Sequence, residues 1–193
     1  MAATDRETRD RRGDLLDRLA DAIAENGIEG VSIRDLATRA GVSIGTVQYY
    51  FSTKSALLQA VWLHVREQAA QRFTSSGVVD MEPAEQLRKL TELLLAPSHE
   101  HRLSRVWLAL AARAAHDPQI AALHREQWVG TEDLLDRVLA RANPARATES
   151  ADAAAALLAL LDGLSISVLT EPDRMPPERA ARIGAAWVDS WLG

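Results

Sequence analysis

Apolar residues recur at three- and four-residue spacing along almost the whole chain, which is the pattern of helices with one buried face. Alternating β-branched runs bounded by turn residues, the signal for strands, are missing. The spacing therefore predicts an all-α protein with about nine helices. The first helix is expected over about 9–25, where Asn26 and Gly27 end it.

Turn and capping residues divide the rest of the chain into the other predicted helices. Two of them are short and are expected over 33–39 and 44–50. Each is preceded by a capping serine, Ser32 or Ser43, and Gly41 supplies the turn between them. The later helices are bounded mainly by proline and capping residues, and are expected over 54–74, 83–96, 98–115, 118–143, 148–170 and from 176 onward.

The first three predicted helices have the spacing of a helix-turn-helix. A longer helix stands in front of two short ones that are separated by a glycine turn, so the second short helix can lie in a major groove. We therefore expect a DNA-binding domain over 1–53 and a larger helical domain over 54–193.

The overall charge argues against a strongly basic nucleic-acid binder. The chain has 193 residues and a net charge of −5, whereas DNA-binding domains are usually basic. Between residues 32 and 60, however, the sequence has three basic residues (Arg34, Arg39 and Lys54) and one acidic residue, Asp35. This local excess favours phosphate contacts but predicts weak nonspecific affinity and a shallow salt dependence.

The residue types also limit where the chain works and what chemistry it carries. Without cysteine it has no disulfide framework and no thiolate metal site. The first residues are charged, and no apolar stretch reaches the roughly 18 uncharged residues of a membrane span. We expect a cytoplasmic protein without a membrane partner, a cofactor, a metal site or a catalytic site.

The second short helix offers side chains suited to DNA. Gly45 leaves room for close approach of its backbone, Thr46 can contact a thymine methyl or a phosphate, and the Gln48 amide suits adenine. Tyr49 and Tyr50 offer hydroxyls at phosphate distance. Behind these side chains we expect a small apolar core of Ala37, Val42, Val47 and Phe51. Lys54, at the start of the next helix, adds an ammonium group that can bind phosphate.

The arginines before this region allow two interpretations. Arg9, Arg11 and Arg12 can lie along a phosphate backbone, yet acidic residues alternate with them. A solvated, frayed start of the chain is the favoured interpretation.

The run GIEGVSIRDLA at 27–37, followed by AGVSIGTVQYYFSTKSALL at 40–58, resembles the DNA-binding domain of the tetracycline-repressor (TetR) family. Order, spacing and the closing aromatic-x-x-Lys-x-x-Leu-Leu element match together over about 12–60. The resemblance implies a transcriptional regulator, most simply a repressor that binds a palindromic operator as a dimer. Many members have tyrosine at the position of Gln48, so base contact and phosphate contact both stay open for this side chain. The expected DNA-binding residues are Ser32, Arg34, Ser43, Ile44, Gly45, Thr46, Gln48, Tyr49, Tyr50 and Lys54.

The stretch from RVWLALAAR at 105–113 to LDGLS at 161–165 is similar to the C-terminal domain of the betaine-repressor (BetI-type) subgroup. That similarity implies a regulatory domain with a cavity for a small-molecule effector and a homodimer formed by the last two long helices. Four large aromatic side chains are candidates for the cavity, although ordinary core packing explains each equally well: Trp62, Phe73, Trp107 and Trp128. The helix over 148–170 is apolar nearly all round, and the expected interface residues are Leu157, Leu161, Leu164, Val168, Trp187 and Trp191.

Two alternatives remain beside an effector-controlled regulator. The first is a DNA-binding regulator that is controlled by a protein partner or has no small-molecule effector. The second is a helical enzyme or carrier, which the sequence disfavours because it has no phosphate loop, no metal-spaced histidine cluster and no paired carboxylates in an apolar setting.

Overall fold

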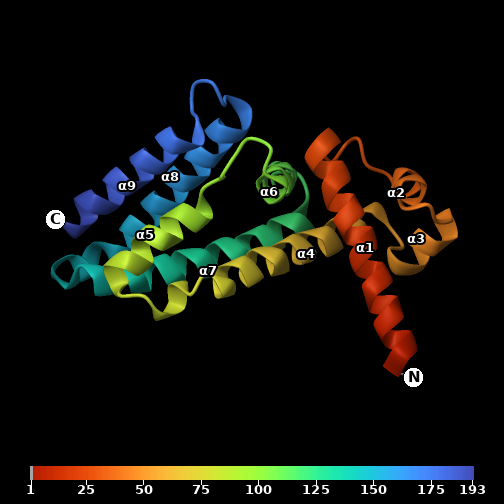
Figure 1. The fold of residues 1–193 in the computed structure, drawn as a ribbon, viewed down its shortest axis with the longest axis horizontal. Coiled ribbons are helices and arrows are strands. Elements are labelled where there is room, and N and C mark those ends of the chain that lie inside the picture. The colour runs from red at the N-terminus through yellow and green to blue at the C-terminus, as the bar shows by residue number, and fades with distance from the viewer. Residues whose placement is uncertain (1) are drawn as a thin grey trace. The chain divides into compact units, whose positions relative to one another are not determined.

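The computed structural model describes residues 2–193, with side chains from Arg11 onward. Within that part of the chain every regular element is a helix and none is a strand (Figure 1). The predicted all-α fold with about nine helices is confirmed. The α-helices are α1 (Ala2–Asn26), α2 (Ile33–Ala40), α3 (Ile44–Tyr50), α4 (Lys54–Ser75), α5 (Pro83–Leu94), α6 (Arg102–Ala114), α7 (Pro118–Ala142), α8 (Ser150–Thr170) and α9 (Pro177–Leu192), and the 3-10 helices are η1 (Val78–Asp80) and η2 (Pro144–Glu149).

The caps of the two short helices lie where the sequence predicts them. The Ser32 hydroxyl accepts a hydrogen bond from the Asp35 backbone N–H at 3.1 Å, and the Ser43 hydroxyl accepts one from the Thr46 N–H at 3.0 Å. Between the two helices Gly41 adopts a φ of 65°, which favours glycine because a Cβ is strained there. The local signals that predicted the helix-turn-helix are thus confirmed.

Helix α6 begins later than expected. It was expected to follow Ser98 but starts at Arg102. The ring of His101 lies at this start: its Nδ1 is 2.8 Å from the Ser104 hydroxyl, and the Arg72 guanidinium donates to its Nε2 at 2.8 Å. The side chain of His101, and not that of Ser98, therefore lies beside the first turn of α6.

Helix α8 also begins slightly later, at Ser150 rather than at Thr148. The preceding residues form η2, which starts at Pro144. The Ser150 backbone N–H donates to the Ala147 carbonyl, which closes the 3-10 segment where α8 begins.

The chain forms two compact units. The first comprises residues up to Ala69 together with Arg105–His124, and the second comprises Ala70–Ser104 together with Arg125–Gly193. These limits differ from the division expected after residue 53, because the first part of α4 is tied to α1. His64 Nε2 of α4 lies 3.1 Å from Asp17 Oδ1 of α1.

The core of the first unit supports the two short helices. Helix α1 buries apolar side chains at three- and four-residue spacing, including Leu16, Leu19 and Ile23. Helices α2 and α3 contribute Leu36 and Val47, which are also fully buried. The apolar spacing seen in the sequence is therefore the packing face of these helices.

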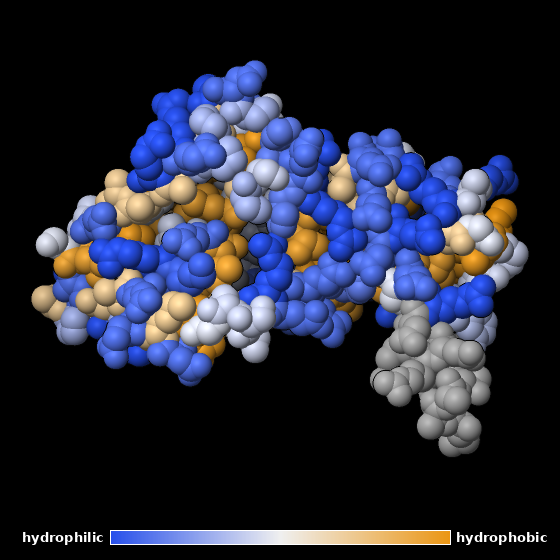
Figure 2. Space-filling model, viewed as in Figure 1, coloured by the Kyte–Doolittle hydropathy of each residue, from blue (hydrophilic) through white to orange (hydrophobic). Residues whose placement is uncertain are grey.

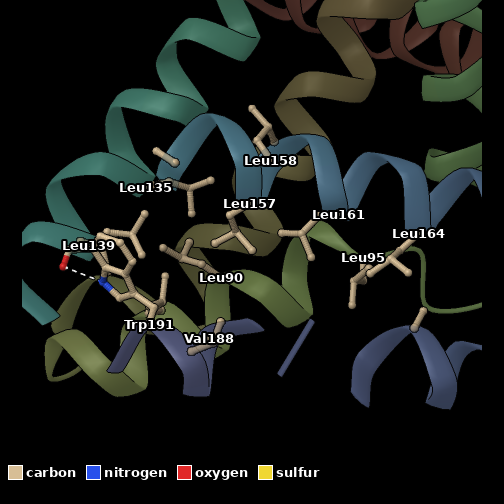
Figure 3. Packing of buried hydrophobic residues seen from close by; sticks show 14 of the residues in the cluster. Leu90, Leu95, Leu135, Leu139, Leu157, Leu158, Leu161, Leu164, Val188 and Trp191 are labelled. Atoms are coloured by element: carbon tan, nitrogen blue, oxygen red, sulfur yellow. Dashed lines mark hydrogen bonds between the residues drawn. The ribbon is translucent and has the colours of Figure 1, made fainter. Parts of the chain in front are cut away.

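The core of the second unit is built from α5, α7, α8 and α9 (Figure 3). The Trp191 indole N–H donates to the Leu139 carbonyl at 3.2 Å, which fixes the end of α9 against α7. Gly184 brings α9 close to α5, since a Cβ there would lie only 2.9 Å from Thr91 Cγ2. This glycine is required by packing rather than by its backbone conformation.

Helix α8 uses most of its large apolar residues inside the protomer. Of the six residues expected at a dimer interface, five are buried in the core of their own unit (Leu157, Leu161, Leu164, Val168 and Trp191), and Trp187 is half-buried and stacked on Trp191. A side chain without exposed surface has no area left to bury against a partner. The five buried residues are core residues of the protomer, so a contact with a second chain would use Trp187 or other positions that keep exposed surface.

By length and composition alone, the segment Pro144–Thr170 would fit a membrane span. A core helix of a globular domain has the same signature. Only 39% of its most apolar window is buried inside the protomer, and Figure 2 shows apolar surface between charged side chains over α8 and α9.

Candidate nucleic-acid interface

Helix α3 is fixed to its unit by one apolar face. Val47 has no exposed surface, and Phe51, at the C-terminal cap, is 1% exposed. The Phe51 backbone N–H donates to the Val47 carbonyl at 2.9 Å, which closes the last turn. The predicted small core behind the helix is confirmed at these two positions.

The opposite face of α3 is exposed. Tyr49 is 79% exposed and Ile44 is 41% exposed, and Gln48 is exposed between them. Tyr50 is half-buried, with its ring centroid 5.1 Å from that of Tyr49 in a T-shaped arrangement. This face carries amide, hydroxyl and apolar groups without any carboxylate.

Gly45 is not required by the fold. Its φ is not positive, and a Cβ there would meet only the Ser43 hydroxyl at 3.6 Å, an ordinary contact. Glycine inside a helix costs about 1 kcal/mol relative to alanine. An exposed helix position that tolerates a side chain but has none is suited to close approach by another molecule.

The hydroxyl groups in the candidate set are engaged in capping. Ser32 bonds both the backbone N–H and the carboxylate of Asp35. The hydroxyls of Ser43 and Thr46 lie 2.9 Å apart. The structure therefore places these three side chains at helix starts, where they already have local partners.

The cations around α2 and α3 fall into two groups. Arg39 pairs with Glu25 at 2.9 Å, and Arg18 donates to the Arg39 carbonyl at 3.2 Å, so both hold α2 against α1. Arg34 and Lys54 are exposed and have no ion-pair partner among the described side chains. These two charges are available to an anion such as phosphate.

The four aromatic side chains expected around an effector are divided between the units. Trp62 and Trp107 belong to the first unit, whereas Phe73 and Trp128 belong to the second and pack against its core. Trp62 is 3% exposed, with its ring centroid 5.7 Å from that of His124. Its indole N–H has no hydrogen-bond partner among the described residues.

Asp162 of α8 was not among the candidate residues. The Trp128 indole N–H donates to its Oδ2 at 2.8 Å, and no cationic side chain in the described part of the chain pairs with it. Burial raises the pKa of this carboxyl to about 6, and the hydrogen bond from Trp128 offsets part of the rise. A signal was present in the sequence, since Asp162 is the sole charged residue between Ala153 and Leu169.

Comparison with known proteins matches both halves of the chain. The family of bacterial regulatory proteins called the tetR family matches residues 15–61, and the C-terminal domain of BetI-type transcriptional repressors matches residues 83–193. The HTH-type transcriptional regulator PksA of Bacillus subtilis (strain 168) is 30% identical over 187 residues, which are 93% of this chain and 89% of PksA.

Solved structures of similar proteins share the fold. A transcriptional regulator from Rhodococcus sp. Rha1 is 32% identical with a TM-score of 0.78, over 92% of this chain and 94% of that one. A transcriptional regulator from Saccharomonospora viridis in complex with choline is 24% identical with a TM-score of 0.81, over 94% and 96%.

The chain belongs to the tetR family of bacterial regulatory proteins, with a C-terminal part of the BetI type. It is a DNA-binding transcriptional regulator, as the resemblance in its sequence predicted.

Proposed function

We propose that the protein acts in the cytoplasm as a homodimeric repressor whose two α3 helices enter successive major grooves of a near-palindromic operator. The exposed face of α3 supports this most directly, because it combines Gln48, Tyr49 and an unneeded glycine at Gly45 with a buried anchoring face. Half-sites about one helical turn apart, or a multiple of it, match such a dimer.

The side chains around α3 have different tasks in this proposal. Gln48 contacts base edges, since its amide can donate to and accept from adenine. Arg34, Tyr49, Tyr50 and Lys54 contact phosphates and set the register, which carries little sequence information. Because the local charge excess is small, affinity depends on two protomers binding together rather than on bulk charge.

The dimer contact uses the exposed face of α8 together with the neighbouring helix α9. Small and apolar residues at three- and four-residue spacing are exposed along α8, and they are Ala155, Ala159, Gly163 and Ile166. An apolar helix face left exposed in the protomer calls for a cover. The same face of a second copy supplies one with matching chemistry.

The effector carries a positively charged group that binds near Asp162. A half-buried carboxylate whose described partner is one neutral indole N–H is costly to ionise, and a cationic ligand would remove that cost. Trp128 adds an aromatic surface suited to such a group. Binding shifts the balance between DNA-binding and released arrangements by roughly 1.4 kcal/mol for each tenfold difference in affinity.

Two measurements test this proposal. Selection of duplexes from a random pool by the wild-type dimer, followed by footprinting, is expected to yield a near-palindrome with two protected half-sites. Selection without any sequence preference would contradict it. A thermal-shift screen of amines and quaternary ammonium compounds against neutral isosteres is expected to raise the melting temperature only with cations. If operator DNA raises the melting temperature and none of these compounds does, the proposal of a cationic effector fails. Control by a protein partner, or regulation without an effector, then replaces it.

A further inference from the structure

A cation from α1 covers the end of α3. The ring of Phe51 is buried although this residue caps the C-terminal end of a helix with one exposed face. The guanidinium carbon of Arg12 lies over this ring, 5.5 Å from its centroid. Arg12 is thus placed by a specific contact and not simply solvated, as the alternation of charges in the sequence suggested. Arg9 lies outside the described side chains.

The covered ring is continuous with the exposed aromatic residues of α3. The centroids of Phe51 and Tyr50 are 6.3 Å apart, and those of Tyr50 and Tyr49 are 5.1 Å apart. Arg12 therefore lies at the buried end of a row of three rings whose other end is exposed. The position of its charge is coupled to the position of this row.

The charge of Arg12 is also available. Its side chain is exposed, and no carboxylate among the described side chains pairs with it, in contrast to Arg39 with Glu25. A guanidinium is planar, so it can stack on a ring with its face while its edge N–H groups bind an anion. A lysine ammonium keeps the charge but lacks the plane.

We propose that Arg12 contacts the DNA backbone beside the C-terminal end of α3 and, through its contact with Phe51, positions that end of the helix. The inference rests on the proposed function, since it needs α3 in the major groove. It adds a residue from α1 to a DNA-binding surface that the sequence assigned to residues 32–54.

The test compares Arg12→Ala and Arg12→Lys with Arg11→Ala, an adjacent exposed arginine for which the structure gives no ring contact. Binding to the duplex selected by the wild type is measured between 50 and 200 mM salt. Loss of one phosphate contact per protomer makes the slope of log affinity against log salt shallower by about 1.8 for a dimer. Between 50 and 200 mM salt, the factor by which affinity falls should therefore be about 12 times smaller for Arg12→Ala than for the wild type. Arg12→Lys should keep the slope.

The positioning role has its own measurement. Backbone hydrogen exchange at Tyr50 and Phe51 is expected to be faster in both Arg12 variants and unchanged in Arg11→Ala. A wild-type slope in Arg12→Ala, or an equal drop in Arg11→Ala, would overturn the contact with DNA. Unchanged exchange in Arg12→Ala would overturn the positioning. If the wild type itself selects no duplex, the proposed function fails instead.

Discussion

The indole N–H of Trp128 on α7 donates a hydrogen bond to Oδ2 of Asp162 on α8 across 2.8 Å. It is the one neutral donor that the structure gives this half-buried carboxylate within the described residues. A buried negative charge without a cation is unfavourable for folding. A protein that keeps such a group gives up stability for another property, and here we assign that property to effector binding.

Asp162→Asn is expected to stabilise the free protein at pH 7.5. The pKa of Asp162 rises from its ordinary value of 3.8 to about 6 on folding, chiefly through burial. The folded state therefore holds the proton more tightly, so the carboxyl lowers stability progressively as pH rises from about 4 to 6 and fully above that range. That rise corresponds to about 3 kcal/mol, which partial exposure reduces to an expected gain of about 1–2 kcal/mol.

Urea unfolding of the wild type and Asp162→Asn at pH 7.5 and at a pH below 3 measures this difference. The gain should vanish at the lower pH, where the wild-type carboxyl is protonated in both states. Asp133→Asn, an exposed carboxyl on α7, is the control and should have no such gain. A gain of equal size at both pH values would rule out ionisation as its cause.

Gly45→Ala separates folding from DNA binding. The added Cβ has room within the protomer, and alanine favours a helix, so unfolding should cost up to about 1 kcal/mol more than in the wild type. Operator affinity should fall, because the methyl group stands between the helix backbone and the groove. Thermal unfolding and a binding titration measure the two effects.

Gly41→Ala is the matched control for that substitution. Its φ of 65° strains any residue with a Cβ, so this variant should lose stability and DNA binding together. Unaltered operator affinity in Gly45→Ala would remove the argument that the missing side chain serves close approach.

Ala159→Arg is expected to convert the dimer to monomers. The position is exposed on α8, so the substitution leaves the protomer core intact but places a charge at the proposed interface. Sedimentation equilibrium should give half the wild-type mass with an unchanged helical circular dichroism spectrum. Ala122→Arg, at an exposed position of α7, should stay dimeric, and a dimeric Ala159→Arg would exclude this face of α8.

The sequence predicts the helix-turn-helix well because its signals are local. Ser32 and Ser43 cap helices through atoms three residues away, and Gly41 acts through its own backbone angle. The roles of Arg12 and Asp162 depend on rings far along the chain, which no local pattern encodes.

Five of the six residues expected at the dimer interface lie in the protomer core instead, for a related reason. A helix that is apolar nearly all round shows which residues are apolar but not which face meets its own core. The structure makes Leu157 and Leu161 part of that core and leaves Ala155 and Ala159 exposed. Only the positions of α5, α7 and α9 around α8 decide between the two faces.

The account depends most on the claim that the exposed face of α3 contacts bases, and Gln48→Ala tests it directly. Kd is measured for this variant and for Lys54→Ala on the selected operator and on a scrambled duplex. Gln48→Ala should lose about 1–3 kcal/mol per protomer on the operator and little on the scrambled duplex, whereas Lys54→Ala should lose similarly on both. Equal losses of Gln48→Ala on the two duplexes would contradict the claim.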